Sequence, residues 1–177
     1  MTTVDVYSAA EEVELLFNGK SVSKAPAGES NRFIAKFDLP YQPGTLTAVS
    51  YTGGKEVSRD EIKTAGKPAA LKISSDVASL KADGQSLAFV VAELVDENGQ
   101  RVPNAEALCT ASVEGEGSLA AFGIARPATT ENYTKACFTA YEGRVMAIVR
   151  AGWQSGSVKV CISAEGVGSA CAELEVK

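Results

Sequence analysis

The segment EEVELLFNGKSV, near the start of the chain, constrains the fold more than any other feature of the sequence. Val13, Leu15 and Phe17 occupy alternate positions with mostly polar residues between them, which is the period of a β-strand with one apolar face. The next two residues are Asn18 and Gly19, the dipeptide that best tolerates the positive φ angles of a tight hairpin turn. The sequence therefore predicts a β-hairpin and a β-rich architecture.

Other segments in the first third of the chain have the same strand character and are separated by Gly, Pro and other turn residues. Residues 32–39 predict a strand with one apolar face, made of Phe33, Ala35, Phe37 and Leu39. No convincing helical pattern is present. The strands predicted in this part of the chain are 4–7, 13–17, 32–39, 45–51 and 56–64.

Small residues followed by Gly66 and Pro68 interrupt this pattern, as expected at a domain junction. After the junction, short strands recur with polar turns between them, which is the spacing of a β-sandwich. We therefore expect two domains, 1–66 and 67–177, with the first cut short at its N-terminus. The strands predicted in the second domain are 70–74, 80–82, 87–96, 108–114, 137–141, 145–151, 158–164 and 170–176.

The strand at 86–95 is apolar on both of its faces. Leu87, Phe89 and Val91 lie on one face, and small or branched apolar residues lie on the other. A strand of this kind usually has both faces covered. We expect its outer face to pack against another domain.

Charge and length exclude several classes of protein. The 177-residue chain has a net charge of −5, and its basic residues form no cluster, which disfavours nucleic-acid binding through phosphate contacts. No apolar run approaches the ~20 residues of a membrane-spanning helix, so we expect no membrane partner. The N-terminal MTTVDVYS lacks the basic region and apolar core of a signal peptide. It enters a strand almost at once, which suggests a piece cut from a longer protein.

Histidine is absent from the sequence, which removes the commonest general base and the commonest metal ligand. Asp96 and Asn98 could supply oxygen ligands to a hard cation such as calcium. The segment DENG at 96–99 is, however, an ordinary hairpin turn, and no downstream Glu completes a known ligand loop. We therefore expect no metal site and no catalytic residue in this chain.

The four cysteines contain no C-x-x-C pair, so a zinc site is not expected. A turn at residues 165–167 would place Cys161 opposite Cys171 on adjacent strands, with both side chains on the face turned away from the apolar one. Two interpretations remain open: a cross-strand disulfide in an oxidising compartment, or two free thiols. Cys109 alternates with apolar residues and is expected in the core.

Aromatic residues are few, and Trp153, Tyr133 and Tyr141 are the only candidates for a sugar-stacking platform in the second domain. Trp153 lies between Gly152 and Gln154, near a turn. A lone tryptophan at a strand end is more often a partly buried cap on a small core. We favour that packing interpretation for Trp153 and extend it to the two tyrosines.

Several longer motifs together resemble a known family. They are VDVYSAAEEVELLFNGKSV, then KFDLPYQPGTLTAVSYTGGKEVSRDEIKTAGKPAALKI, and in the second domain LKADGQSLAFVVAELVDENGQRVPNA with ENYT and GRVMAIVRAG. The first two resemble the C-terminal accessory region of bacterial glycoside hydrolase family 2 enzymes of the β-galactosidase type. The third looks like a bacterial immunoglobulin-like (Ig-like) domain. The likeness covers nearly the whole chain and implies an all-β fold of two tandem Ig-like β-sandwich domains.

The resemblance also implies a function. In such enzymes the two catalytic glutamates lie in a separate TIM barrel upstream, and no motif here matches that barrel. The family often has a Gly-Asn-Gly-Asp-Pro-like loop; residues 122–127 here are FGIARP, without the Asn and Asp, which leaves the role of the 122–133 loop near a substrate open.

We therefore expect non-catalytic modules that need no cofactor and scaffold the catalytic domain of the same parent polypeptide, in a periplasmic or extracellular protein. Two alternatives remain: a carbohydrate-binding module, and an Ig-like stalk or adhesin spacer.

Overall fold

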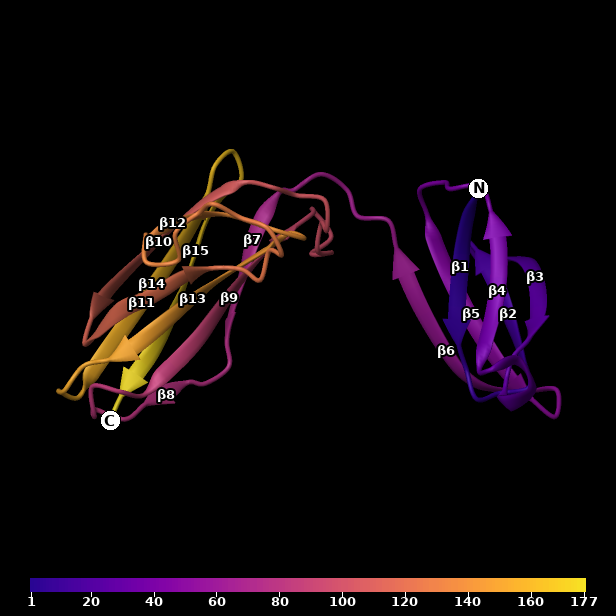
Figure 1. Cartoon of the computed structure of the whole chain (residues 1–177), viewed down its shortest axis with the longest axis horizontal. Coiled ribbons are helices and arrows are strands. Elements are labelled where there is room, and N and C mark those ends of the chain that lie inside the picture. The colour runs from indigo at the N-terminus through magenta and orange to yellow at the C-terminus, as the bar shows by residue number, and fades with distance from the viewer. The chain divides into compact units, whose positions relative to one another are not determined.

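The computed structural model describes residues 1–177, and they form two compact units, 1–64 and 65–177. Almost every regular element is a strand, as Figure 1 shows. The division falls two residues before the predicted boundary at 66/67. The backbone N–H of Gly66 donates to Asp96 Oδ2 at 2.8 Å, so Gly66 is held by the second unit.

The first unit is a sandwich of two unequal sheets. One sheet has two strands in the order β1-β4, and the other has four in the order β3-β2-β5-β6. A single 3₁₀ turn, Glu29–Asn31, precedes β4. The strands are β1 (Thr2–Tyr7), β2 (Glu12–Phe17), β3 (Lys20–Pro26), β4 (Ile34–Leu39), β5 (Thr45–Thr52) and β6 (Lys55–Lys63).

The predicted hairpin is confirmed. β2 and β3 pair antiparallel, and Asn18 and Gly19 have φ angles of 50° and 76°, the left-handed region that the turn requires. Asn18 Oδ1 also accepts a hydrogen bond of 2.9 Å from the N–H of Thr45, which connects the turn to β5. The turn residues therefore set both the hairpin and the position of its neighbouring strand.

The core of the first unit is small. Its buried residues are Val13, Leu15, Ala27, Ala35 and Phe37. The prediction that Phe33 joins this face is wrong, because Phe33 is 47% exposed and has a φ of 62°. Its N–H donates to the carbonyl of Gly28 at 2.7 Å and closes a turn, so the extended backbone begins only at Ile34.

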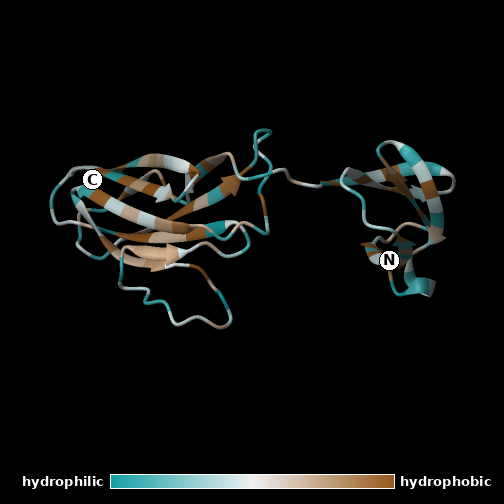
Figure 2. Ribbon diagram, turned by 90° about the horizontal axis from the view of Figure 1, so that it is seen from above, coloured by the Kyte–Doolittle hydropathy of each residue, from teal (hydrophilic) through white to brown (hydrophobic).

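The second unit is a fuller sandwich. Its sheets have the orders β12-β10-β14-β15-β8 and β11-β13-β9-β7, and alternating hydrophobic and paler bands along the strands are visible in Figure 2. Both units thus have the predicted Ig-like β-sandwich architecture. The strands are β7 (Ala70–Ser75), β8 (Ser79–Leu80), β9 (Leu87–Val95), β10 (Leu108–Gly115), β11 (Gly117–Gly123), β12 (Cys137–Thr139), β13 (Arg144–Ala151), β14 (Gly156–Ala164) and β15 (Gly168–Val176).

The core of this unit lies between the two sheets and includes Phe122 and Phe138, both fully buried. The sequence patterns did not predict β11, although it forms one edge of the four-stranded sheet. A bulge between Leu119 and Ala121 interrupts its alternation, so that Leu119 and Phe122 both pair with buried residues of β13.

Candidate functional site

The outer surface of the four-stranded sheet in the second unit is the most distinctive surface of the chain. We call it the β9 face and define it by Leu87, Phe89, Val91, Met146 and Ile148. In β9 these residues alternate with a fully buried set, so they point away from the core. Leu87 and Phe89 are each 39% exposed. The second unit does not itself cover this outer face, and the expectation that another domain packs against it stays a prediction.

Strand pairing makes these side chains one continuous patch. Phe89 lies opposite Ile148, and Val91 lies opposite Met146, on β9 and β13. Ala121 of β11 lies on the other side of Ile148. Directly opposite residues of an antiparallel pair have Cβ atoms within about 5.5 Å of each other, so the apolar side chains pack side by side across three strands.

The patch has a defined rim and extends into a groove. Arg144 Nη2 and Glu93 Oε1 form an ion pair of 2.7 Å at one end. The Asp76 carboxylate accepts the N–H of Phe89 at 2.8 Å. An apolar groove of about 230 Å³ continues past Met146 and Ile148 and is lined by Ala121, Phe122, Gly123, Ile124, Ala125 and Tyr133.

The opposite outer surface of the same sandwich has a different chemistry. On the five-stranded sheet, outward positions of β10 and β14 carry Thr110, Ser112, Lys159 and Ser163. A water-facing sheet normally presents such residues. The apolar composition of the β9 face is thus local and does not reflect a generally apolar surface. It is the kind of patch that usually marks a contact with another macromolecular surface.

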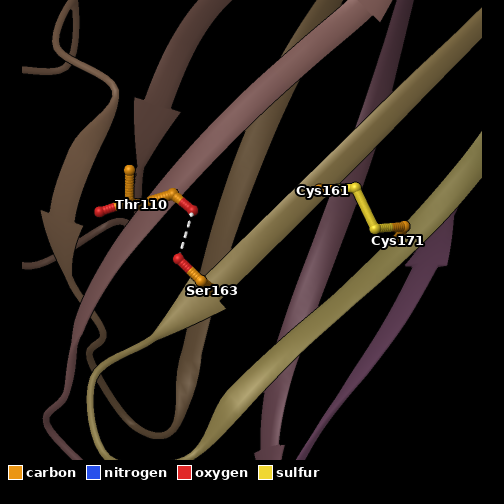
Figure 3. The surroundings of a disulfide bond; sticks show 4 residues. All are labelled: Thr110, Cys161, Ser163 and Cys171. Carbon is orange, nitrogen blue, oxygen red and sulfur yellow. Dashed lines mark hydrogen bonds between the residues drawn. A yellow bond between two sulfur atoms is a disulfide. The ribbon is translucent and has the colours of Figure 1, made fainter.

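Cys161 and Cys171 lie on that polar surface. They are directly opposite in the β14–β15 pair, as the turn-based register predicted, with Cα atoms 4.1 Å apart and the sulfurs joined in a disulfide. Figure 3 shows the bond between the two strands, and Ser163 Oγ, which donates to the Thr110 carbonyl at 3.4 Å. The structure thus favours the disulfide over the two free thiols.

The connection between β11 and β12 is held at several points and contains the predicted aromatic Tyr133. Its hydroxyl donates to the carbonyl of Ile124 at 3.0 Å, and its ring lies 4.9 Å from that of Phe138. The Glu131 carboxylate accepts both the N–H and the hydroxyl of Thr139 on β12, at 2.7 and 2.9 Å. Only part of the predicted 122–127 loop is a loop in the structure. Phe122 and Gly123 are buried at the end of β11, and the loop begins after them.

The three predicted aromatics do not form one platform. Tyr141 lies just before β13, and the Cζ atom of Arg126 lies 5.5 Å from the centroid of its ring. Tyr141 therefore contacts the 124–133 segment, which also contains Tyr133. Trp153 follows the other end of β13, a strand of eight residues. At about 3.3 Å per residue that strand is about 26 Å long. Tyr133 and Tyr141 therefore both contact residues 124–126, whereas Trp153 lies at the other end of β13.

Trp153 is 75% exposed, so the prediction that it is a partly buried cap is wrong. One edge of its indole ring lies against Gly84, where a Cβ would fall 2.4 Å from Trp153 Cε2. The Gly84 N–H donates to the Gly152 carbonyl at 3.0 Å and holds the two segments together. The ring is thus positioned by its neighbour yet largely open to solvent.

The carboxylates whose pKa values are shifted are all shifted in the same direction. Hydrogen bonds to the charged form lower the pKa of six of them, which are Glu14, Glu56, Glu61, Asp83, Asp96 and Glu175. A glycosidase general acid needs the opposite, a raised pKa. These six groups are suited to ion pairing and turn formation.

Asp96 illustrates that structural role. It is only 4% exposed, and its carboxylate accepts the N–H groups of Gly66, Asn98 and Gln100 at 2.8 to 2.9 Å. The turn interpretation of residues 96–99 is confirmed, since the carboxylate oxygens are used by the backbone. No group of three or more Cys, Asp or Glu residues is placed to hold a metal ion.

The two cysteines outside the disulfide differ in exposure. Cys109 is fully buried, as predicted, and burial raises the pKa of its thiol to about 11. A thiol of this kind is a small core residue and not a nucleophile. Cys137 is exposed. No helix has the length and apolar character needed to cross a bilayer.

The fold is that of two Ig-like β-sandwich modules, and the second of them carries the exposed apolar β9 face. Comparison with known proteins gives the family. The model of glycoside hydrolase family 2 C-terminal domain 5 matches residues 71–173, and a domain of unknown function, DUF4982, matches residues 1–58. The chain belongs to the family 2 C-terminal domain 5 family.

Individual relatives agree with this assignment. The chain is 32% identical over 171 residues to the β-galactosidase BoGH2A of Bacteroides ovatus, covering 97% of this chain and 20% of that protein. It is 34% identical over 133 residues to a β-galactosidase of Thermoanaerobacter pseudethanolicus, covering 64% and 17%. A solved glycosyl hydrolase family 2 member from Bacteroides cellulosilyticus is 33% identical, with a TM-score of 0.95, and the match covers 99% of this chain and 23% of that one. The chain thus spans about a fifth of the length of these relatives.

Proposed function

We propose that this chain is a pair of non-catalytic accessory modules of a β-galactosidase-like family 2 enzyme, and that it supports the catalytic part through the β9 face. The observation that carries the proposal is the uncovered apolar patch on a chain that matches only the C-terminal region of much longer glycosidases. An exposed patch of this composition gains stability when a second apolar surface covers it.

The chemistry of the chain supports the same role. It has no histidine, and the carboxylates with shifted pKa values are held in the charged form. Glu56 is one of these, because its hydrogen bond with Arg59 lowers its pKa. The expected catalytic contribution of this chain alone is therefore none, and the chemistry belongs to the part of the enzyme that this chain accompanies.

Two measurements test the proposal. The purified chain is assayed with aryl β-galactosides, and we expect no turnover above the buffer blank. Phe89→Asp is then introduced into the full-length enzyme and into the isolated chain. We expect faster thermal inactivation of the enzyme, with kcat/KM unchanged at low temperature and little change in the unfolding of the isolated chain.

The matched control is Leu108→Asp, which replaces another exposed apolar residue, on β10 of the other sheet. It is expected to leave thermal inactivation of the enzyme unchanged. Glycosidase activity that copurifies with the isolated chain, or equal effects of the two substitutions, would contradict the proposal.

The disulfide supports a further part of the proposal, that the parent protein is periplasmic or extracellular. Disulfides persist in such oxidising compartments and are rare in a reducing cytosol. Rapid alkylation of cells that express the full-length enzyme would measure the redox state of Cys161 and Cys171. Finding both thiols reduced would contradict this location.

Carbohydrate binding is a second candidate function, favoured by the exposure of Trp153. An exposed indole ring can stack on the apolar face of a sugar. Tyr133 lies beside Met146 and Ile148 of β13, and Tyr141 lies just before that strand, whereas Trp153 follows its other end. Trp153 is thus a single aromatic contact, so we propose weak binding at most.

A further inference from the structure

We propose that the first unit takes up one additional β-strand along the free edge of β1, antiparallel to it, and that apolar side chains of this strand fill the groove between β1 and β6. The strand would come from the polypeptide that carries the catalytic part; the source of the strand rests on the proposed function, but the acceptor site does not.

The two sheets of the first unit are unequal in a way that leaves one side open. Two strands, β1 and β4, lie over four. β3 is in contact with β4 and closes one side of the sandwich, whereas β6 has no comparable contact with β1. In Figure 1, β6 lies beyond β1 on the side away from β4. Every residue of β6 is exposed, although it pairs fully with β5.

The open side is a groove with an apolar floor. Its volume is about 350 Å³, and it lies between inward residues of β1 and the inner positions of β5 and β6. Ile62 of β6 pairs with Leu46 of β5 and is 61% exposed. The apolar residues that line the groove are Val4, Val6, Leu15, Leu46, Ala48 and Ile62.

The edge beside the groove presents the backbone groups that recognise a strand. The Ser8 N–H donates to the Phe33 carbonyl at 2.9 Å. Because hydrogen-bonded and non-hydrogen-bonded pairs alternate along an antiparallel ladder, Val6 and Val4 also bond to β4. The N–H and C=O groups of Thr3, Asp5 and Tyr7 therefore point to the free edge of β1.

These two features specify the occupant. Unpaired N–H and C=O groups at alternate residues bind an extended backbone, and a groove under alternate side chains selects apolar residues at every second position. A small ligand would use the groove but not the edge. The relatives supply ample polypeptide for such a strand, since the chain spans about a fifth of their length.

The experiment supplies a strand by extending the chain. Because β1 begins at Thr2, its antiparallel neighbour can be reached from the N-terminus by a two-residue turn. The probe is the chain with Thr-Val-Lys-Val-Thr-Asn-Gly joined directly to Thr3 in place of the first two residues. The two valines then lie opposite Val4 and Val6 and face the groove. The matched control carries Ser at both valine positions.

The measurement is amide hydrogen exchange of Asp5 and Tyr7, whose N–H groups point to the free edge. We expect exchange in the valine probe to slow by about tenfold or more relative to the serine control. Ile62→Lys, placed in both proteins, is expected to remove most of this difference while leaving the unextended chain folded. These readouts do not involve the β9 face or enzyme activity.

Three outcomes would overturn the proposal. The first is equal exchange of the Asp5 and Tyr7 amides in the valine and serine proteins. The second is an unextended chain in which those amides are already protected. The third is a concentration-dependent dimer of the unextended chain by sedimentation, lost on Asp5→Pro, which would show that the edge serves a second copy instead.

Discussion

The two units follow the same strand-and-turn plan but differ in how completely they close. The first unit has 64 residues, and its core contains five buried residues. The second unit has 113 residues, and its core contains 22. The first unit has two strands over four, and the second has five over four. The second unit also has a disulfide across its β14–β15 pair.

This difference shows that a strand pattern alone does not make a self-sufficient sandwich. The first unit has a free edge on β1 and an exposed β6, and its stability depends on few apolar contacts. Small domains bury a smaller fraction of their surface and are correspondingly marginal. The second unit has a larger buried core, and the β9 face is an apolar part of its outer surface. The comparison can be tested by perturbing matched sites in the two units.

The largest expected effect comes from truncating the core of the second unit. Phe122 is fully buried, and Phe122→Ala is expected to destabilise that unit by about 3–5 kcal/mol through lost burial and the cavity left behind. Phe33→Ala removes the same side chain from a half-exposed position in the first unit and should cost less than about 1 kcal/mol. Hydrogen exchange of peptides from each unit measures both changes. Equal losses of unfolding free energy in the two variants would mean that the difference in burial between Phe122 and Phe33 does not determine their contributions to stability.

The next effect comes from the disulfide. Cys161 and Cys171 are ten residues apart, and the chain-entropy model gives about 2–3 kcal/mol for closing a loop of that length. The double substitution Cys161→Ser and Cys171→Ser should lower the stability of the second unit by that amount and leave the first unit unchanged. Urea denaturation with and without reductant measures the change. Cys137→Ser, at an exposed free thiol, is the control and should have no effect.

A smaller effect, and one that depends on pH, comes from Asp96. The backbone N–H of Gly66 is the largest of the hydrogen-bonding contributions that lower the pKa of this carboxyl. Its stabilising contribution is therefore complete above the ordinary carboxyl pKa of about 3.9 and is lost as the pH falls through the lowered value. Asp96→Asn should reduce Tm at pH 7 and leave a flatter decline below pH ~4 than the original protein shows.

The control for this pH dependence is Glu165→Gln, in the exposed turn between β14 and β15. It should leave both the Tm at pH 7 and the acid decline unchanged. A parallel decline in the Asp96→Asn protein and the original protein would show that other carboxyls govern acid unfolding of the second unit.

The parts of the fold that the sequence predicted are those fixed by local chemistry. Asn18 and Gly19 set the hairpin because few other residues adopt their φ angles. The turn at Gly166 likewise sets the register that brings Cys161 opposite Cys171. Once a turn is placed, period-two alternation determines which side chains point to the core.

The parts that the sequence did not predict depend on departures from that alternation or on contacts between distant segments. The bulge in β11 puts Leu119 and Phe122 on the same side although they are three residues apart, which hides the strand. The turn that holds Phe33 out of the core is closed by Gly28, and no local pattern indicates it. The apolar β9 face was visible in the sequence because it needs only alternation, whereas the exposure of this face in the second unit comes from the structure.

The smallest expected effect on stability comes from Trp153→Ala. The side chain is 75% exposed, so its loss should change the unfolding free energy by less than about 0.5 kcal/mol. The ring lies against Gly84, which is far from Trp153 in the sequence. Local sequence patterns do not show such a contact, so they could not predict how much of the ring stays exposed. Titration with galactose-containing oligosaccharides, followed by Trp fluorescence, should show weak binding at most. Tight binding that Trp153→Ala abolishes would instead make this unit a carbohydrate-binding module. The contrast between the polar outer sheet and the apolar β9 face would then no longer support a scaffolding role for the β9 face.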